Sequence, residues 1–309
     1  MRITRTVAET RAALTEEPRP LGFVPTMGAL HEGHLALVEA ATRSCTAVAA
    51  SLFVNPTQFG PDEDFGAYPR DEARDLELFE RAGVDTVFVP TAASLYQDGF
   101  STEIQVRSLT EHFEGDERPD HLGGVALVVT KLLNIVRPDI AFFGQKDAQQ
   151  LAVVRRLVRD LDMPLEIVGV PTVREPDGLA VSSRNAYLTP AARAAAPDLY
   201  QALLAGARAA AEPGGSCKDA VAAAAAFLAA PDTDLQDEEV RREFLGRTRP
   251  ARPQLGIDYL AVVDADTFEQ TETLGPRALL IAAARLGATR LLDNISLSPS
   301  AYPERDATP

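Results

Sequence analysis

The chain has 309 residues, and its acidic side chains outnumber the basic ones, which gives a formal net charge of −15 at pH 7. This charge excludes nucleic acids and anionic membranes as expected partners, and no stretch reaches the roughly 18 consecutive apolar residues of a membrane span. Its two cysteines, Cys45 and Cys217, lie far apart, which excludes a disulfide framework and suggests a reducing, cytoplasmic location.

From the N-terminus to about residue 172, short apolar runs alternate with segments of helical periodicity. The apolar runs predict buried strands at Leu21–Thr26, Ala47–Val54, Thr86–Pro90, Ile140–Gly144 and Leu165–Val170. The segments between them predict helices at His34–Cys45, Asp71–Ala82, Val125–Val136 and Gln149–Leu161. Strands separated by helices indicate an α/β fold with a doubly wound parallel sheet, in which ligands bind beyond the carboxyl ends of the strands.

The composition changes after about residue 185. Residues 191–230 are alanine-rich and helical, and the charged stretch 231–254 is expected to be an exposed insertion. The apolar runs Ile257–Val263, Leu279–Ile281 and Arg290–Leu297 predict further strands. We therefore expect two domains, residues 1–172 and a smaller α+β domain over residues 173–309.

The first candidate site is Pro25–His34, where a predicted strand ends and a helix starts. His31 and His34 are three residues apart, so they share a face of the first helical turn, and Gly33 leaves room for a close approach. A helix N-terminus and two imidazoles can donate hydrogen bonds to a phosphate as its charge develops. The alternative is an ordinary helix cap with two surface histidines.

Two further loops carry cationic groups. Ser182, Ser183 and Arg184 could hold a triphosphate, although Ser-Ser-Arg also occurs in ordinary loops. Lys146 and Asp147 follow another predicted strand, where the lysine could neutralise a phosphate and the aspartate could bind a ribose hydroxyl. A solvated Lys-Asp loop is the alternative.

Neutral amides lie near two other strand ends. Asn55, Gln58 and Gln150 suit the hydroxyl groups of a small polyol acid better than charged groups would, but they could equally be surface amides. Glu114 and Arg118 lie in a charged segment for which a solvated loop is the stronger interpretation. The chain has no G-x-G dinucleotide fingerprint, no Gly-Lys pair of a P-loop and no G-x-S-x-G nucleophile elbow.

Longer sequence motifs identify a family. A His-x-Gly-His followed far downstream by Ser-Ser-Arg resembles the nucleotidyltransferase superfamily that includes class I aminoacyl-tRNA synthetases. Within that superfamily, the chain resembles the pantothenate synthetases over residues 1–230 and 255–297. The segments that carry this resemblance are Phe23–His34, Phe53–Phe59, Tyr68–Arg70, Lys131–Pro138, Phe142–Gln150 and Gly169–Ala180.

The resemblance implies a Rossmann-like ATP- and pantoate-binding domain and a C-terminal lid domain, in a cytoplasmic homodimer. It also implies a reaction in two steps: pantoate attacks the α-phosphate of Mg²⁺-bound ATP, the co-substrate, and β-alanine then attacks the resulting pantoyl adenylate and releases AMP. By this pattern the catalytic residues are His31, His34, Lys146, Ser182, Ser183 and Arg184. The expected ATP-binding residues are Met27, Gly33, Gly144, Asp147, Val173 and Val181. The expected substrate-binding residues are Pro25, Thr26, Asn55, Gln58, Gln150, Tyr68, Glu114 and Arg118, and Asp75 is a candidate metal ligand.

Three features depart from the family pattern. Val181 stands where the family usually has methionine, Gln145 stands where it usually has glutamate, and the segment 231–254 is longer than expected. They leave open a related adenylate-forming amide ligase that uses a different hydroxy acid or amine. A nucleotidyl transferase that releases no AMP, and a non-catalytic nucleotide sensor, are further alternatives.

Overall fold

The computed structural model describes residues 1–61, 63, 65–229 and 253–298. Its first sheet has six strands in the order β1-β4-β3-β2-β5-β6, and every neighbouring pair is parallel. The strands are β1 (Arg2–Thr4), β2 (Leu21–Thr26), β3 (Ala47–Leu52), β4 (Thr86–Phe88), β5 (Ile140–Gly144) and β6 (Glu166–Val170). The five predicted strands are confirmed. The edge strand β1 was missed because its three residues form no apolar run.

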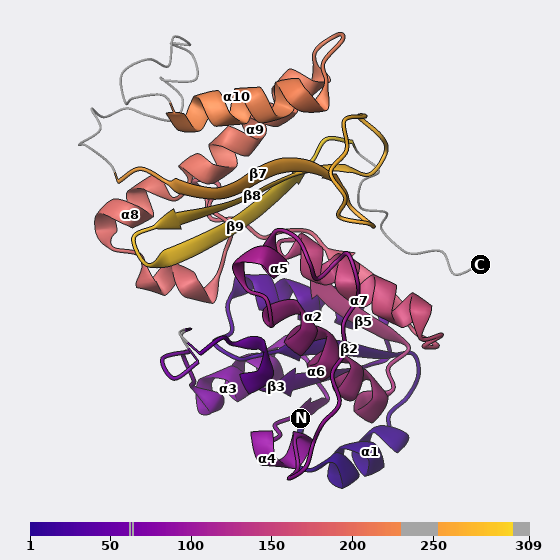
Figure 1. Cartoon of the computed structure of the whole chain (residues 1–309). Helices are drawn as coiled ribbons and strands as arrows, with labels where there is room; N and C mark the ends of the chain where they lie inside the picture. Colours follow the sequence, from indigo (N-terminus) through magenta and orange to yellow (C-terminus); the bar gives the residue numbers. More distant parts are fainter. Residues whose placement is uncertain (62, 64, 230–252, 299–309) are drawn as a thin grey trace.

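Helices cover both faces of this sheet, as a doubly wound fold requires (Figure 1). They are α1 (Val7–Thr15), α2 (Glu32–Ser44), α3 (Glu72–Ala82), α4 (Ala92–Leu95), α5 (Glu114–Glu117), α6 (His121–Val136) and α7 (Ala148–Asp160), with a 3₁₀ turn η1 at Pro56–Gln58. The four predicted helices are confirmed, with α6 starting four residues earlier than expected. None of the helices in the described ranges is long and apolar enough to cross a bilayer.

Adjacent residues of the central strands enter different cores, which explains the nearly continuous apolar runs. Phe23 packs with Val129 of α6 on one face of the sheet. Its neighbour Val24 packs with Val38 of α2 and Phe79 of α3 on the other face. Because the strands are buried on both faces, the residue at which each strand ends is well determined.

The strand order places the topological switch point between β2 and β5. The chain leaves β2 toward β3 on one side, whereas β5 pairs with β2 on the other side. In open α/β sheets this is where the loops diverge and leave room for a ligand. The segments that follow β2 and β5 are the ones that carry His31, His34, Lys146 and Asp147.

The C-terminal part is an antiparallel sheet covered by helices on one face, which confirms the smaller α+β unit. Its strands are β7 (Gly256–Asp264), β8 (Ala278–Leu286) and β9 (Thr289–Ser296). Before them come a 3₁₀ turn η2 (Ser183–Tyr187) and the helices α8 (Pro190–Ala195), α9 (Asp198–Ala211) and α10 (Cys217–Ala229). Most of the predicted insertion 231–254 lies outside the described residues, and the boundary at residue 172 stays a prediction.

The small sheet lies between its own helices and the parallel-sheet half (Figure 1). Along β8 the side chains alternate between two cores, as the two-residue period of a strand requires. Leu280 packs with Leu203 of α9, whereas Leu279 and Ile281 pack with Val153 of α7. This second contact holds the C-terminal sheet against the helix that begins directly after Lys146 and Asp147.

Candidate active site

The two histidines of the first motif form a stacked pair at the start of α2. His31 is the N-cap, and its Nδ1 accepts a hydrogen bond from the Gly33 backbone N–H at 3.2 Å. The rings of His31 and His34 lie 4.0 Å apart between centroids, with an angle of 25° between their planes. The expectation that they share one face of the first helical turn is confirmed.

Both histidines are neutral at neutral pH. Burial lowers the pKa of His34 to about 3, with the charges of His31 and Lys146 adding to the effect. Burial and the Lys146 charge also lower the pKa of His31. Because Nδ1 of His31 accepts a hydrogen bond, the ring proton of His31 lies on Nε2, which makes Nε2–H a donor.

The turn between β2 and α2 is held by Asp75 of α3. Its carboxylate accepts the backbone N–H groups of Ala29 and Leu30 at 2.8 and 2.9 Å. Gly28 and Ala29 have positive φ angles of 89° and 51°, so this turn needs such an anchor. Asp75, the candidate metal ligand, is 2% exposed and anchors the turn, and its role as a metal ligand stays a prediction. Within the described ranges no three or more His, Cys, Asp and Glu side chains gather as a metal site.

Lys146 and Asp147 lie at the end of β5, on the other side of the switch point. Lys146 Nζ lies 3.5 Å from Asp147 Oδ1. Burial would raise the pKa of Asp147, but Lys146, His121 and Arg184 outweigh it, so the pKa is lowered and the group is a carboxylate. The charges of Lys146 and Asp147 also shift the pKa values of His31 and His34. The two histidines therefore lie within electrostatic range of Lys146.

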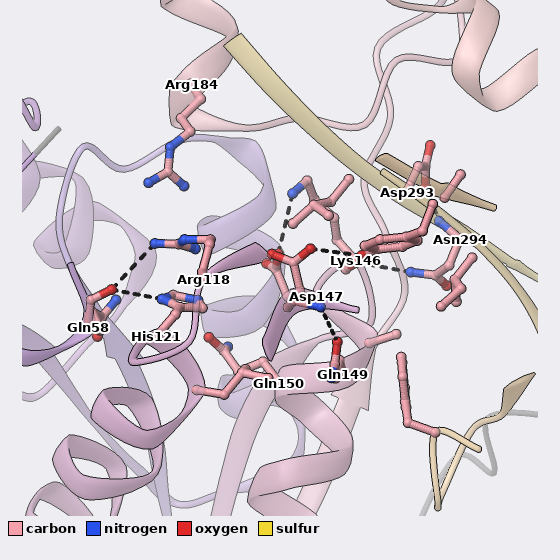
Figure 2. Close-up of a pocket in the computed structure, with 18 of the residues that line it drawn as sticks. Gln58, Arg118, His121, Lys146, Asp147, Gln149, Gln150, Arg184, Asp293 and Asn294 are labelled. Atoms are coloured by element: carbon pink, nitrogen blue, oxygen red, sulfur yellow. Dashed lines mark hydrogen bonds and ion pairs between the residues drawn. The ribbon is translucent and has the colours of Figure 1, made fainter. Parts of the chain in front are cut away.

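A cavity of about 120 Å³ opens between the switch point, the α5–α6 segment and the C-terminal sheet. Figure 2 shows Arg118 and His121 converging on Gln58, with Lys146 and Asp147 nearer the strand that carries Asp293 and Asn294. The predicted site residues that line this cavity are Met27, Gln58, Glu114, Arg118, Lys146, Asp147, Gln150 and Arg184. All three loops that the sequence analysis singled out thus reach the cavity, through Met27, Lys146 and Arg184, whereas His31 and His34 are not among its lining residues.

Asn55 supports the cavity wall, and its expected contact with substrate stays a prediction. Its Nδ2 donates to Gln58 Oε1 and to the Gly124 carbonyl, at 3.2 and 3.1 Å. Its Oδ1 accepts from Thr57 and from the Tyr96 hydroxyl. With these bonds Asn55, 1% exposed, fixes the turn that carries Gln58.

Thr26 and Gly33 also have roles within the protein. The Thr26 hydroxyl donates to the Ser51 carbonyl at 2.8 Å and accepts the Gly28 N–H at 3.3 Å, which closes the turn. A Cβ at Gly33 would lie 2.9 Å from Cε1 of His31, so glycine here makes room for the imidazole. Pro25 lies within β2, beside Thr26.

The Ser-Ser-Arg loop is held from both sides. Ser182 caps η2 by accepting the Arg184 N–H, and the Ser183 hydroxyl lies 3.5 Å from the Tyr68 hydroxyl. The Val181 N–H donates to the Val173 carbonyl. Of these loop residues, Arg184 lines the cavity. At the end of β5, a Cβ added at Gly144 would meet no other atom within 4 Å, so this position is open.

Glu114 is buried and connects the two halves of the chain, which contradicts the solvated-loop interpretation. It accepts two hydrogen bonds from Arg290 of β9, both at 2.7 Å, and one from the Tyr259 hydroxyl at 2.8 Å. Arg118 is also shielded, and it forms an ion pair with Glu63 at 2.5 Å.

Comparison with known proteins places this site in a family. The family profile described as pantoate-beta-alanine ligase matches residues 2–296. The chain belongs to the pantoate-beta-alanine ligase family. The pantothenate synthetase of Chloroflexus aggregans is 51% identical over 295 residues, which cover 95% of this chain and 99% of that protein.

Solved structures of this family have the same fold. A pantothenate synthetase structure from Thermus thermophilus shares 48% identity, covering 97% of this chain and 100% of that one, with a TM-score of 0.84. A pantoate-beta-alanine ligase from Francisella tularensis, complexed with beta-gamma ATP and beta-alanine, shares 28% identity with a TM-score of 0.71 and covers 96% and 98% of the two chains. The resemblance stated from the sequence is confirmed.

Several cavity residues of this ligase were not singled out from the sequence, among them His121, Asp293 and Asn294. His121 begins α6, and its Nδ1 lies 2.9 Å from the Gln58 carbonyl oxygen. Asn294 of β9 donates to the carbonyls of Gln145 and Lys146, both at 2.9 Å, and Asp293 binds Arg174. His121 could have been found as one of only four histidines, whereas no local pattern marks the β9 pair.

Proposed function

We propose that the cavity at the switch point carries out both steps of the family reaction. The chain is an ATP-dependent ligase that forms pantothenate from pantoate and β-alanine through a pantoyl adenylate, with release of pyrophosphate and AMP. The observation that carries the residue assignment is the stacked, neutral His31–His34 pair within electrostatic range of Lys146.

In the first step a pantoate carboxylate oxygen bonds to the α-phosphorus of ATP, and the bond from that phosphorus to the pyrophosphate oxygen breaks. Negative charge grows on the α-phosphate oxygens in the transition state. Nε2–H of His31 and the ring of His34 donate hydrogen bonds to these oxygens, and Lys146 contributes a full positive charge. Neutral imidazoles keep their donors without adding like charge next to Lys146.

In the second step the neutral amine of β-alanine attacks the acyl carbon, the bond from that carbon to the AMP oxygen breaks, and the amine nitrogen releases one proton to solvent. The acid is already activated, so no enzyme nucleophile is needed and the protein has to align the reactants. Ser182, Ser183 and Arg184 hold the phosphates released or transferred in these steps. Asp147 binds the ribose.

Gln58 and Gln150 are proposed to bind the pantoate hydroxyls. Nε2 of Gln58 lies 2.9 Å from the Met27 sulfur, a weak acceptor that a hydroxyl group can replace with a net gain. Oε1 of Gln58 is held by Asn55, so the amide is oriented before substrate arrives. A pre-oriented amide can bind a hydroxyl group with little loss of side-chain conformational entropy.

Magnesium fits this site as a companion of ATP. Mg²⁺ keeps several waters and is usually bound by substrate phosphates and one or two carboxylates, so it does not need a cage of protein ligands. Asp147 is the carboxylate of the cavity nearest to Lys146 and could supply such a contact, and the metal would screen the phosphate charges. The homodimer and the cytoplasmic location stay predictions of the family resemblance.

The test is a product assay. The protein is incubated with Mg²⁺ and ATP, a panel of hydroxy acids and a panel of amines, and the products are read by mass. We expect pantothenate, AMP and pyrophosphate when pantoate and β-alanine are both present. AMP release without an amine acceptor, or preference for another acid, would contradict the proposal.

A further inference from the structure

The turn η1, which carries Gln58, is held from behind by groups that lie outside the substrate cavity. Gln58 lines that cavity, whereas the described residues Asn55 and Tyr96 do not. A Cβ at Gly124 of α6 would lie 2.1 Å from the Thr57 carbonyl oxygen, so the backbone of η1 rests directly on α6. The orientation of the Gln58 amide therefore depends on contacts at its buried side.

Tyr96, the residue at which α4 ends, makes the shortest of the hydrogen bonds to Asn55. Its hydroxyl donates to Oδ1 of Asn55 at 2.7 Å, and the same oxygen accepts from Oγ1 and the backbone N–H of Thr57 at 3.1 and 3.3 Å. On the other side of the amide, Nδ2 of Asn55 donates to Oε1 of Gln58 at 3.2 Å. One side chain thus connects the Tyr96 hydroxyl to Gln58.

The hydrogen bonds of this chain run in one direction. The Gly124 carbonyl can only accept and the Thr57 N–H can only donate, so Nδ2 of Asn55 faces the first group and Oδ1 the second. Nδ2 then binds Oε1 of Gln58, which leaves Nε2 of Gln58 as the donor available to a substrate. A hydroxyl that donates to Oδ1 polarises the amide and strengthens the bond that its Nδ2 donates, so Tyr96 supports the orientation of Gln58.

The ring of Tyr96 is itself held from several sides. Its centroid lies 6.3 Å from that of Phe53 and 5.2 Å from that of Phe100. Nζ of Lys131 lies 5.4 Å from the same centroid, where an ammonium group is attracted to an aromatic face. Burial raises the pKa of the Tyr96 hydroxyl, so the group is protonated at neutral pH. Tyr96 is therefore a fixed donor.

We propose that Tyr96 is a positioning residue for the acid substrate: it fixes Asn55, which orients the Gln58 amide toward a hydroxyl group of the acid. The inference rests on the proposed function, because it takes Gln58 as the amide that binds this hydroxyl. Tyr96 does not line the cavity, so it acts through its neighbours. Its loss should weaken the recognition of one hydroxyl group and leave ATP binding unchanged.

The first experiment compares Tyr96→Phe with the wild type on three acids. They are pantoate and the two analogues that each lack one of its hydroxyl groups, and kcat/KM is measured for acid-dependent exchange of pyrophosphate into ATP. With pantoate, kcat/KM should fall about 3- to 10-fold, the loss expected for one neutral hydrogen bond. With the analogue that lacks the hydroxyl bound by Gln58, it should stay the same. The KM for ATP should not change.

Gln58→Ala identifies that analogue, because an acid without the hydroxyl that Gln58 binds should lose least in this variant. The double variant then tests the route of the effect. If Tyr96 acts through Gln58, Tyr96→Phe should cause no further loss of pantoate-dependent exchange in the Gln58→Ala background. Losses that multiply would show that Tyr96 acts by another route, which contradicts the inference.

Tyr200→Phe is the matched control, and Thr57→Val is the second variant. The Tyr200 ring lies on α9 with the Arg174 guanidinium carbon 3.5 Å from its centroid, and phenylalanine keeps this contact. The preference among the three acids should not change in this control. Thr57→Val removes the other hydroxyl that donates to Asn55, so it should shift the preference as Tyr96→Phe does, and it replaces that variant if Tyr96→Phe does not fold.

Two results would overturn the inference while the proposed function stands. One is an equal loss of kcat/KM for all three acids in Tyr96→Phe, which would assign the hydroxyl to the stability of the fold. The other is an unchanged kcat/KM for pantoate in both Tyr96→Phe and Thr57→Val. A wild type without pantoate-dependent exchange would contradict the proposed function, and the inference with it.

Discussion

The proposed site has two sides, a local wall at the switch point and a long-range wall opposite it, and they are built in different ways; the cavity lining includes Lys146 but not His31 or His34. The wall at the switch point consists of short strand-turn-helix segments, in which His31 caps its own helix and Lys146 contacts its neighbour Asp147. The opposite wall depends on partners far apart in the chain, such as Glu114 with Arg290 and Asn294 with the Lys146 carbonyl. Groups proposed to meet the reacting phosphate are thus placed locally, and long-range contacts align the rest around them.

The largest expected effect comes from the local wall. His34→Ala removes a donor proposed to act on the α-phosphate, so pantoate-dependent exchange should fall about 10²- to 10³-fold, as for a lost oxyanion donor. The control is His112→Ala, because His112 is exposed and its backbone carbonyl, which holds Gln149, is kept. A His34→Ala enzyme that retained most of its exchange activity would remove this histidine from the mechanism.

A smaller effect is expected from the anchor of the same turn. Asp75→Asn replaces one of two acceptors by a donor that faces a backbone N–H, so the free energy of unfolding should decrease by about 1.5–3 kcal/mol. Because the turn positions His31, kcat should also fall while the KM for ATP changes little. Urea denaturation and steady-state kinetics measure the two effects.

Glu77→Gln is the matched control for Asp75→Asn. Glu77 lies on the same helix, is exposed and pairs with Arg81 at the surface, so its loss should be nearly neutral. Equal stability losses for the two variants would mean that the Asp75 bonds to the turn do not stabilise it. A loss confined to the KM for ATP would assign Asp75 to binding.

The smallest of these effects is expected at the long-range wall. Asn294→Ala removes two hydrogen bonds to the turn that carries Lys146, so ATP should bind about 1–2 kcal/mol more weakly, a 5- to 30-fold rise in its dissociation constant. Equilibrium titration with ATP measures it, with exposed Asn134→Ala as the control. A loss as large as that of His34→Ala would mean that the two walls do not differ in the way described.

The sequence predicts the parallel sheet well because its strands are apolar runs buried on both faces. It does not predict β1, whose short length leaves no periodic signal, or the position of β9, whose Leu291 packs in the same core as Leu203 of α9. Of the site, the His31–His34 pair and Lys146 could be predicted because they belong to local motifs. Asn294 could not, because its carbonyl partners lie about 150 positions away.

Residue type alone does not show which polar groups also have partners inside the protein. Asn55 and Thr26 have the chemistry to bind a hydroxylated acid, and the structure shows that they form hydrogen bonds within the protein as well. Asp75 has the chemistry to bind a metal, and its carboxylate accepts two backbone N–H groups. The number of donors and acceptors on a side chain indicates its partner only when its neighbours in the structure are known.

The central claim is that neutral imidazoles, not imidazolium ions, face the phosphate. The direct measurement is a pH titration of ¹⁵N-labelled histidine side chains in the free enzyme by NMR, with signals assigned by single variants. The account predicts that His34 stays neutral from pH 8 down to about pH 4, because its pKa is about 3, and that His31 carries its proton on Nε2. Protonation of His34 with a midpoint near its ordinary value of 6.5 would contradict the account.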